Sequence, residues 1–219
     1  MILHGVGPEP DTRSAFDFLA KLYRHDEDDG WLTLFSIDRH TGQRQTAWAP
    51  LTRLFTLEPA LRRLAPAGDV WFGVAPRERE LSEGRRGGVT DCLSIPALWL
   101  DIDVANDVHK LPGLCPTYQM AQRLALSWQQ PPSLTVHSGY GLQCWWPLGE
   151  PVMGLDAQAL LTRWNQTWQR IANGAEVHLD NTANIDRVMR LPGTFNFKGA
   201  EPVPVTFEEG ADGSLLPDW

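Results

Sequence analysis

The stretch "ALWLDIDV", residues 97–104, decides how this chain folds and where its chemistry lies. Apart from two aspartates it is apolar, as a buried β-strand is. Charged side chains rarely lie inside a protein unless they are paired or bound to an ion. Two anionic groups within such a strand therefore predict a bound cation, or basic side chains close beside them.

Side-chain alternation sorts this strand into two faces. Because successive residues of a strand point to opposite sides, Trp99, Asp101 and Asp103 share one face. The other face is apolar and is expected to be buried: Leu98, Leu100, Ile102 and Val104. The Cα atoms of the two aspartates are about 7 Å apart by strand geometry. That separation suits one divalent cation, or two cations about 3.5–4 Å apart, and oxygen ligands favour Mg²⁺ or Mn²⁺.

An Asp-x-Asp pair does not by itself establish a metal site. The plain alternative is a strand end at which both carboxylates face solvent or pair with arginines. Without a cation, two neighbouring carboxylates repel each other, and the pKa of at least one of them is expected to rise. Other segments of the chain have to decide between these possibilities.

A third carboxylate and a group of basic residues lie in "HLDNTANIDRVMRLPGTFNFK", residues 178–198. Asp180 follows a short apolar segment and is expected at the end of a strand. Three cations come after it: Arg187, Arg190 and Lys198. Arginine binds phosphate through two parallel hydrogen bonds, whereas lysine acts as a point charge. Any one arginine could instead pair with a neighbouring acid such as Asp186.

Two glycine-containing segments are further candidates for ligand contact. In "HSGYGLQ", residues 137–143, two glycines would let the backbone approach a ligand and form an anion-binding nest, although a tight hairpin explains them equally well. Gln143 then emerges on the next strand as a neutral donor and acceptor. The polar segment "RERELSEGRRGGVT", residues 77–90, is predicted to be a loop, and loops on a rigid scaffold often carry function.

Composition narrows the class of protein. With 219 residues, 42% of them hydrophobic and 21% charged, the chain is expected to form one soluble globular core. It has no apolar run long enough to span a membrane and no secretory signal pattern. Three scattered cysteines fit a reducing cytoplasm rather than a disulfide framework, and His109 with Cys115 lacks two further metal ligands at suitable spacing.

The net charge of −8 counts against a nucleic-acid partner, whose phosphates favour basic surfaces. The acidic residues are, however, partly concentrated in residues 24–30 and in the C-terminal tail, which leaves room for a local basic groove. The ten tryptophans predict an aromatic core, with any exposed ones available for base stacking.

Hydrophobic periodicity predicts an α/β (α+β) protein, because strands and helices intermix without strict alternation. A helix is expected from Asp11 or Thr12 onward, with Phe16, Leu19, Ala20 and Tyr23 on its apolar face. Further helices are expected at 57–65, 117–130 (with Met120, Leu124 and Trp128 on one face) and 155–172. Strands are expected at 31–38, 69–76, 97–104 and 201–209, with two more in 132–148.

Taken together, the motifs resemble the archaeo-eukaryotic primase superfamily, in particular the primase-polymerases (PrimPol) of plasmids, phages and mobile elements. The superfamily pattern consists of an apolar-Asp-x-Asp/Glu strand, a small-residue-x-His element and a later apolar-Asp. "LWLDIDV", "SGYGLQ" and "HLD" correspond to these three parts. "RVMRLPGTFNFK" is similar to the Arg-x-x-Arg-apolar-Pro-Gly-Thr-x-Asn-x-Lys segment of the phage and plasmid branch, and the arginine-rich "WFGVAPRERE" to its lead-in. The resemblance covers about residues 65–210.

The resemblance implies a single catalytic domain over residues 1–219. Its catalytic core, about residues 66–210, would be built on an RRM-like mixed sheet. An N-terminal α/β lobe would take elements from about residues 1–65.

The same resemblance implies roles for individual residues. Asp101, Asp103 and Asp180 would hold two divalent ions, Mg²⁺ or Mn²⁺. The nucleotide would be bound by Gln143, Ser138, Gly141, Arg187, Arg190 and Lys198. The template or the initiating nucleotide would contact Arg77, Arg85, Arg86 and His137. Gln143 stands where the family usually has a histidine, and since it adds no positive charge, triphosphate affinity is expected to depend more on the arginines.

The function that follows is template-dependent nucleotidyl transfer from (d)NTPs on single-stranded DNA, in replication or repair of a phage or mobile element. A helicase or an accessory primase domain, in the same or another chain, would be a further partner. Two alternatives remain open. A DxD nucleotide-sugar transferase would explain Asp101 and Asp103 but leave Asp180 unused. A non-catalytic DNA-binding module would have to keep three carboxylates facing a phosphate path.

Overall fold

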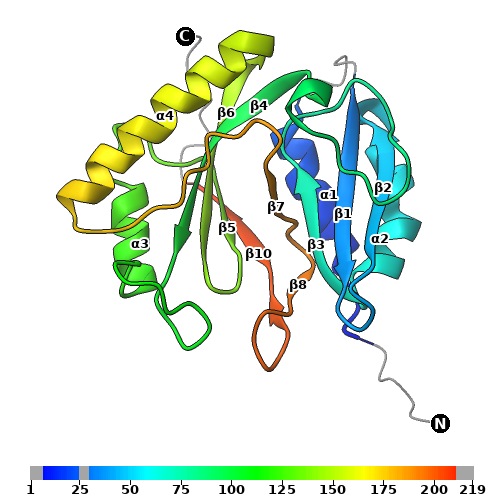
Figure 1. Cartoon of the computed structure of the whole chain (residues 1–219), viewed down its shortest axis with the longest axis horizontal. Helices are drawn as coiled ribbons and strands as arrows, with labels where there is room; N and C mark the ends of the chain where they lie inside the picture. Colours follow the sequence, from blue (N-terminus) through cyan, green and yellow to red (C-terminus); the bar gives the residue numbers. More distant parts are fainter. Residues whose placement is uncertain (1–6, 25–29, 211–219) are drawn as a thin grey trace.

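The computed structural model describes residues 7–24 and 30–210, so most of the acidic segment 24–30 and most of the tail lie outside it. Two four-stranded sheets stand side by side (Figure 1). The first has the order β2-β1-β3-β7 and comprises β1 (Trp31–Asp38), β2 (Arg44–Pro50), β3 (Gly68–Gly73) and β7 (Val188–Arg190). The second has the order β10-β5-β6-β4 and comprises β4 (Ser94–Asp103), β5 (Leu134–His137), β6 (Gly141–Met153) and β10 (Thr206–Glu209). A small hairpin pairs β8 (Phe195–Asn196) with β9 (Val203–Pro204).

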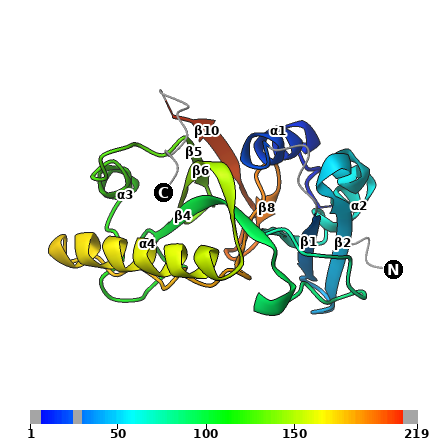
Figure 2. The ribbon, with the colours of Figure 1, turned by 90° about the horizontal axis from the view of Figure 1, so that it is seen from above.

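Helices cover the sheets from outside. They are α1 (Thr12–Leu22), α2 (Glu58–Leu64), α3 (Tyr118–Ala125) and α4 (Gly154–Gly174), with 3₁₀ turns η1 (Leu51–Leu57) and η2 (Val89–Asp91). Seen from above, α3 and α4 lie against the second sheet, α2 lies against the first, and α1 lies between α2 and β10 (Figure 2). None of the described helices is long and apolar enough to cross a membrane.

Helix α1 begins where its local sequence predicts, whereas its buried face and the end of α3 differ from the prediction. The Asp11 carboxylate accepts a hydrogen bond from the Ser14 amide at 3.0 Å and so begins α1 as expected. The apolar face of α1 is shifted, because Phe18 is buried and Ala20 is exposed. Helix α3 ends at Ala125, five residues earlier than its periodicity predicts. Its Met120 is 38% exposed rather than part of the buried face.

The two faces of β4 meet different parts of the core. Trp99 lies opposite Trp145 of β6, with ring centroids 6.2 Å apart, and Trp145 also packs on Phe18 of α1 and Phe72 of β3. The next pair in the β4–β6 ladder, Leu98 and Trp146, faces α4. There Trp146 packs against Trp164 and Trp168. Aromatic side chains therefore fill both sides of the second sheet, in line with the predicted aromatic core.

The predicted fold class is confirmed: the chain is an α+β protein. The ladders between the described strands run antiparallel, and the one parallel contact is an isolated bridge between Val104 and Cys115. The first sheet takes β3 and β7 from beyond residue 65, so both sheets draw on the 66–210 region. One continuous set of buried residues links the two sheets.

The expectation that Asp180 ends a strand is wrong. Residues 175–187 run from α4 to β7 without regular structure. The backbone is held instead by side chains of α4: Gln169 donates to the Leu179 carbonyl at 3.0 Å, and Asn165 accepts from the Thr182 amide at 3.0 Å. Because these contacts satisfy the backbone, the segment needs no strand partner. The predicted strand 201–209 is likewise divided, into β9 and β10.

Candidate functional site

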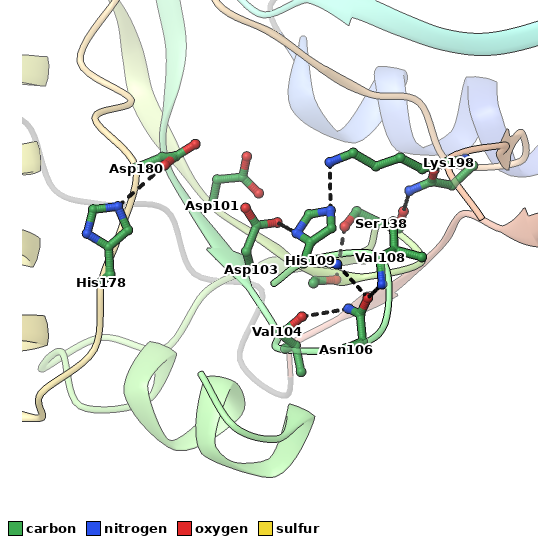
Figure 3. Close-up of polar contacts among 12 residues, drawn as sticks. Asp101, Asp103, Val104, Asn106, Val108, His109, Ser138, His178, Asp180 and Lys198 are labelled. Carbon is green, nitrogen blue, oxygen red and sulfur yellow. Dashed lines mark hydrogen bonds and ion pairs between the residues drawn. The ribbon is translucent and has the colours of Figure 1, made fainter. Parts of the chain in front are cut away.

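A polar pocket of about 210 Å³ lies between the two sheets and gathers the side chains of the sequence motifs. Its lining includes Asp101, Asp103, Gln143, Ser138, Asp180, Arg187, Arg190 and Lys198. The structure therefore brings together residues from β4, β6, the β5–β6 turn, the segment after α4 and the chain around β7 and β8. Figure 3 shows Asp180 on the side of the pocket opposite Lys198, with Asp101 and Asp103 between them.

Three carboxylates line this pocket: Asp101, Asp103 and Asp180. The pKa of Asp101 is raised to about 6, first by burial and then by the negative charges of Asp103 and Asp180. Arg187 opposes this rise, with its guanidinium 3.5 Å from Asp101 Oδ2. One arginine thus compensates only part of the negative charge, and the remainder would attract a cation.

The donor chemistry fits a hard divalent cation, because carboxylate oxygens are the ligands that Mg²⁺ and Mn²⁺ prefer. The geometry fits less completely: among residues 7–24 and 30–210, no group of three or more His, Cys, Asp or Glu side chains is arranged to hold a metal ion. The side chain of Asp180 is 53% exposed, against 20% for Asp101 and 29% for Asp103. The β4 pair is therefore the rigid part of a candidate site, and Asp180 would have to approach it.

Two of the pocket's cations are already paired with acids. Arg187 contacts Asp101, whereas Arg190 forms an ion pair with Asp69 and lies over the Trp71 ring at 5.2 Å. Asp69 also accepts the Phe197 amide at 3.0 Å. Sequence reasoning did not single out Asp69, because a lone aspartate in a strand gives no signal of a partner 121 residues away.

Gln143 is buried with one face toward the pocket. It lies opposite Asp101 in the β4–β6 register and is 4% exposed. Its Oε1 is buried and has no hydrogen-bond partner among the described residues, and the residue lines the pocket. Gly141 does not line the pocket. A Cβ there would lie 2.4 Å from the Ile102 carbonyl oxygen, so the glycine allows close strand pairing.

The four residues expected at the template lie in three different places. Arg77 is fully buried and donates to the carbonyls of Ala75 and Arg86, so its task is to hold the loop, and we do not carry it forward as a DNA contact. Arg85 and Arg86 line a second pocket of about 600 Å³ beside the first. His137 faces Glu208 at 3.6 Å and lines neither pocket.

His109 is a pocket residue that sequence reasoning did not place here. Its imidazole bridges Asp103 and Lys198 (Figure 3), with Nδ1 3.2 Å from Asp103 Oδ1 and Nε2 2.6 Å from Lys198 Nζ. The only local signal is the turn-forming Asn106 after β4. The lining is completed by Trp71, Tyr140, Val188 and Asn196, for which the sequence predicted no individual role.

The raised pKa of Asp101 predicts a pH-dependent stability. Between the ordinary value of 3.8 and about 6, the folded protein keeps a proton that the unfolded chain has released. This contribution to stability is present below about pH 4 and is lost as the pH rises through 6. At pH 8 and without metal, Asp101→Asn is therefore expected to raise the free energy of unfolding by about 2–3 kcal/mol.

Urea unfolding of the wild type and the variant from pH 4 to 8, in the presence of EDTA, measures this difference. The gain is expected to shrink toward pH 4, and the exposed Asp107→Asn serves as control. An equal effect of Asp101→Asn at pH 4 and pH 8 would show that burial of the ionised carboxylate is not its cause.

Comparison with known proteins shows which solved structures have a similar fold. No protein-family model and no curated protein sequence matches the chain. Among solved structures, the AEP domain of the cyanophage S-2L primase-polymerase is similar with a TM-score of 0.59 and 18% identity, over 96% of this chain and 95% of that domain. Primase RepB′ is similar with a TM-score of 0.58 and 16% identity, over 92% of this chain and 58% of that one.

The catalytic domain of RepB′ in complex with initiator DNA is similar with a TM-score of 0.54 and 16% identity, over 92% of this chain and 87% of that one. At these identities the likeness is one of fold. The chain therefore has the fold shared by the AEP domain of the phage primase-polymerase and by the primase RepB′.

Proposed function

We propose that the chain is a DNA primase-polymerase that joins nucleotides from (d)NTPs on a single-stranded DNA template. The observation that carries this proposal is the pocket itself: three aspartates and three cations, drawn from both sheets, line about 210 Å³. The reaction forms a bond between a 3′-oxygen and an α-phosphorus, breaks the bond to the β-phosphate and releases pyrophosphate. Its substrates are polyanionic, which accounts for cations beside a cation-attracting carboxylate pair.

Asp101, Asp103 and Asp180 would hold two divalent ions, Mg²⁺ or Mn²⁺. Ions held by these residues would neutralise charge on the triphosphate and would lower the pKa of the attacking hydroxyl. Asp101 and Asp103 keep their spacing because β4 is paired along its length with β6. The chain thus contributes a rigid pair of carboxylates and one more exposed carboxylate, Asp180.

Basic and polar side chains would bind and orient the phosphates. Arg187 lies at the carboxylate edge and can turn from Asp101 toward a phosphate. Arg190 is held by Asp69, so it is fixed in direction and partly neutralised. Gln143 offers its amide to a phosphate oxygen, and Ser138 lines the same pocket.

The template would follow the open face of the first sheet. Strand register places Phe35 opposite Trp71, and Trp71 opposite Arg190, on that face. The second pocket contains Phe35 and Trp71 together with Arg85 and Arg86, and it shares Trp71 with the carboxylate pocket. Aromatic rings and arginines in one groove suit stacked bases and a phosphate backbone.

Four broader assignments stay predictions. These are a single catalytic domain over residues 1–219, a cytoplasmic location, a role in replication or repair of a phage or mobile element, and a helicase or accessory primase partner. The nucleotide-sugar transferase alternative is less well supported, because it gives no task to Asp180 or Arg187, which line the same pocket as Asp101.

The direct test is incubation of the chain with single-stranded DNA, labelled nucleotides and Mn²⁺, with product length read on a gel. Template-dependent products are expected without a primer, and EDTA is expected to remove them. Extension of a supplied primer alone would restrict the proposal to a polymerase. Binding of single-stranded DNA without any product, under either condition, would overturn the proposal in favour of a non-catalytic module.

A further inference from the structure

The loop after β4 is folded so that His109 points into the carboxylate pocket (Figure 3). Asn106 organises it: its Oδ1 accepts the amides of Val108 at 2.8 Å and His109 at 2.9 Å, and its Nδ2 donates to the Val104 carbonyl. The amide of Ala105 donates to the Cys115 carbonyl at 2.8 Å and closes the loop. The position of His109 is therefore built into the loop rather than left to an exposed, mobile side chain.

The contacts of the His109 ring determine which nitrogen carries the proton. Asp103 can only accept a hydrogen bond through its carboxylate, and Lys198 can only donate through its ammonium. The neutral imidazole with its proton on Nδ1 satisfies both, donating to Asp103 and accepting from Lys198. The ring is also stacked at 5.9 Å on Tyr140, and the side chain is 12% exposed.

Lys198 differs from the other cations of the pocket. Arg187 and Arg190 each face a carboxylate, whereas Lys198 has no acidic side chain within ion-pair distance in the described part of the chain. Its partner is the His109 imidazole, and its backbone amide donates to Asn196 Oδ1 at 3.0 Å. Lys198 therefore keeps its whole charge for a ligand, at a point fixed by His109.

We propose that His109 is a positioning residue, which holds the Lys198 ammonium at the pocket edge to bind the polyphosphate of an incoming nucleoside triphosphate. This inference rests on the proposed function and deepens it. A compact, uncompensated ammonium suits a phosphate oxygen, and Gln143 supplies no charge of its own. A lysine side chain loses much conformational freedom on binding, so an imidazole that already restrains it makes binding tighter.

A double-mutant cycle tests the coupling of the two residues. Equilibrium affinity for a fluorescent nucleoside triphosphate with Mn²⁺ is measured for the wild type, His109→Ala, Lys198→Ala and the double variant. We expect about 30-fold weaker binding for Lys198→Ala, the loss of one charge-assisted hydrogen bond, and about tenfold for His109→Ala. Because His109 acts through Lys198, the double variant is expected to bind as weakly as Lys198→Ala and no weaker.

Additive losses in this cycle would overturn the inference, as would unchanged affinity in His109→Ala. Weakened binding of single-stranded DNA, with triphosphate affinity intact, would also overturn it by assigning Lys198 to the template. His178→Gln is the matched control, because His178 lies near Asp180 at 3.8 Å but does not contact a lysine. Primer synthesis is measured on the same proteins, with KM expected to change more than kcat.

A spectroscopic measurement tests the geometry without activity. Long-range proton–nitrogen NMR of the imidazole rings, assigned with His109→Gln, is expected to show the proton of His109 on Nδ1 in the wild type. A proton on Nε2 would contradict the bridge. If the two substitutions are coupled in triphosphate affinity but the chain makes no primers, only the proposed function is wrong. If the chain makes primers but the two losses of affinity are additive, only the positioning role of His109 is wrong.

Discussion

Asp101→Asn and Asp103→Asn are each expected to reduce template-dependent primer synthesis by at least about a thousandfold. Asparagine keeps the size of the side chain and one oxygen, but it removes the charge that would hold a divalent ion. Because both residues lie on a strand paired along its length with β6, the fold does not depend on their charge. The initial rate of product formation on single-stranded DNA with Mn²⁺ measures the effect.

Two further variants frame this prediction. Asp107→Asn changes an exposed aspartate in the loop that follows the same strand, and its rate is expected to stay within about twofold of the wild type, as is usual for exposed positions. Asp180→Asn is expected to lose activity as well, since its charge acts on Asp101. Primer synthesis by Asp101→Asn or Asp103→Asn within tenfold of the wild type would remove the basis for the proposed metal site.

Trp145→Ala is expected to lower the free energy of unfolding by about 3–5 kcal/mol, the usual cost of deleting a large buried ring. Trp145 is fully buried and contacts Trp99 in its own sheet, Phe72 in the other sheet and Phe18 in α1. A cavity there would loosen the two sheets that together form the pocket. Urea unfolding followed by circular dichroism measures the loss.

Trp145→Phe is the matched control for this substitution. It keeps an aromatic ring and removes an indole N–H that has no hydrogen-bond partner among the described residues. A cost of about 1 kcal/mol is expected, because less volume is lost and a buried donor without a partner disappears. If the alanine variant cost no more than the phenylalanine variant, the packing between the sheets would not depend on this ring.

Much of the architecture followed from local patterns. The strand predicted at 31–38 is β1 residue for residue, and the helix predicted at 155–172 is the central part of α4. In α4 a period of 3.6 residues sets the buried face, whereas β1 is a short, mostly apolar run that is buried on both faces and ends at a turn. The helix predicted at 117–130 failed at its C-terminal end, where the apolar spacing continues but the helix does not.

The gathering of the candidate residues followed from the sequence where a motif marks them, while their roles stay predictions. Asp101, Asp103 and Asp180 do line one pocket, together with Arg187, Arg190 and Lys198. The burial of Arg77 and the pairing of Arg190 with Asp69 were not predictable, because both depend on partners supplied by the folding of distant segments. The sequence of a polar loop does not indicate whether the guanidinium of an arginine in it faces solvent or the protein interior.

The sequence by itself determined the class of fold, the two faces of β4 and the identity of the charged residues, because these depend on periodicity and residue type along one element. Only the tertiary structure decided how those charges are shared. It placed Arg187 beside Asp101, gave Arg190 to Asp69, and set His109 between Asp103 and Lys198. Electrostatic and hydrogen-bond partners are chosen by distances of a few ångströms in space, and a linear sequence does not contain those distances.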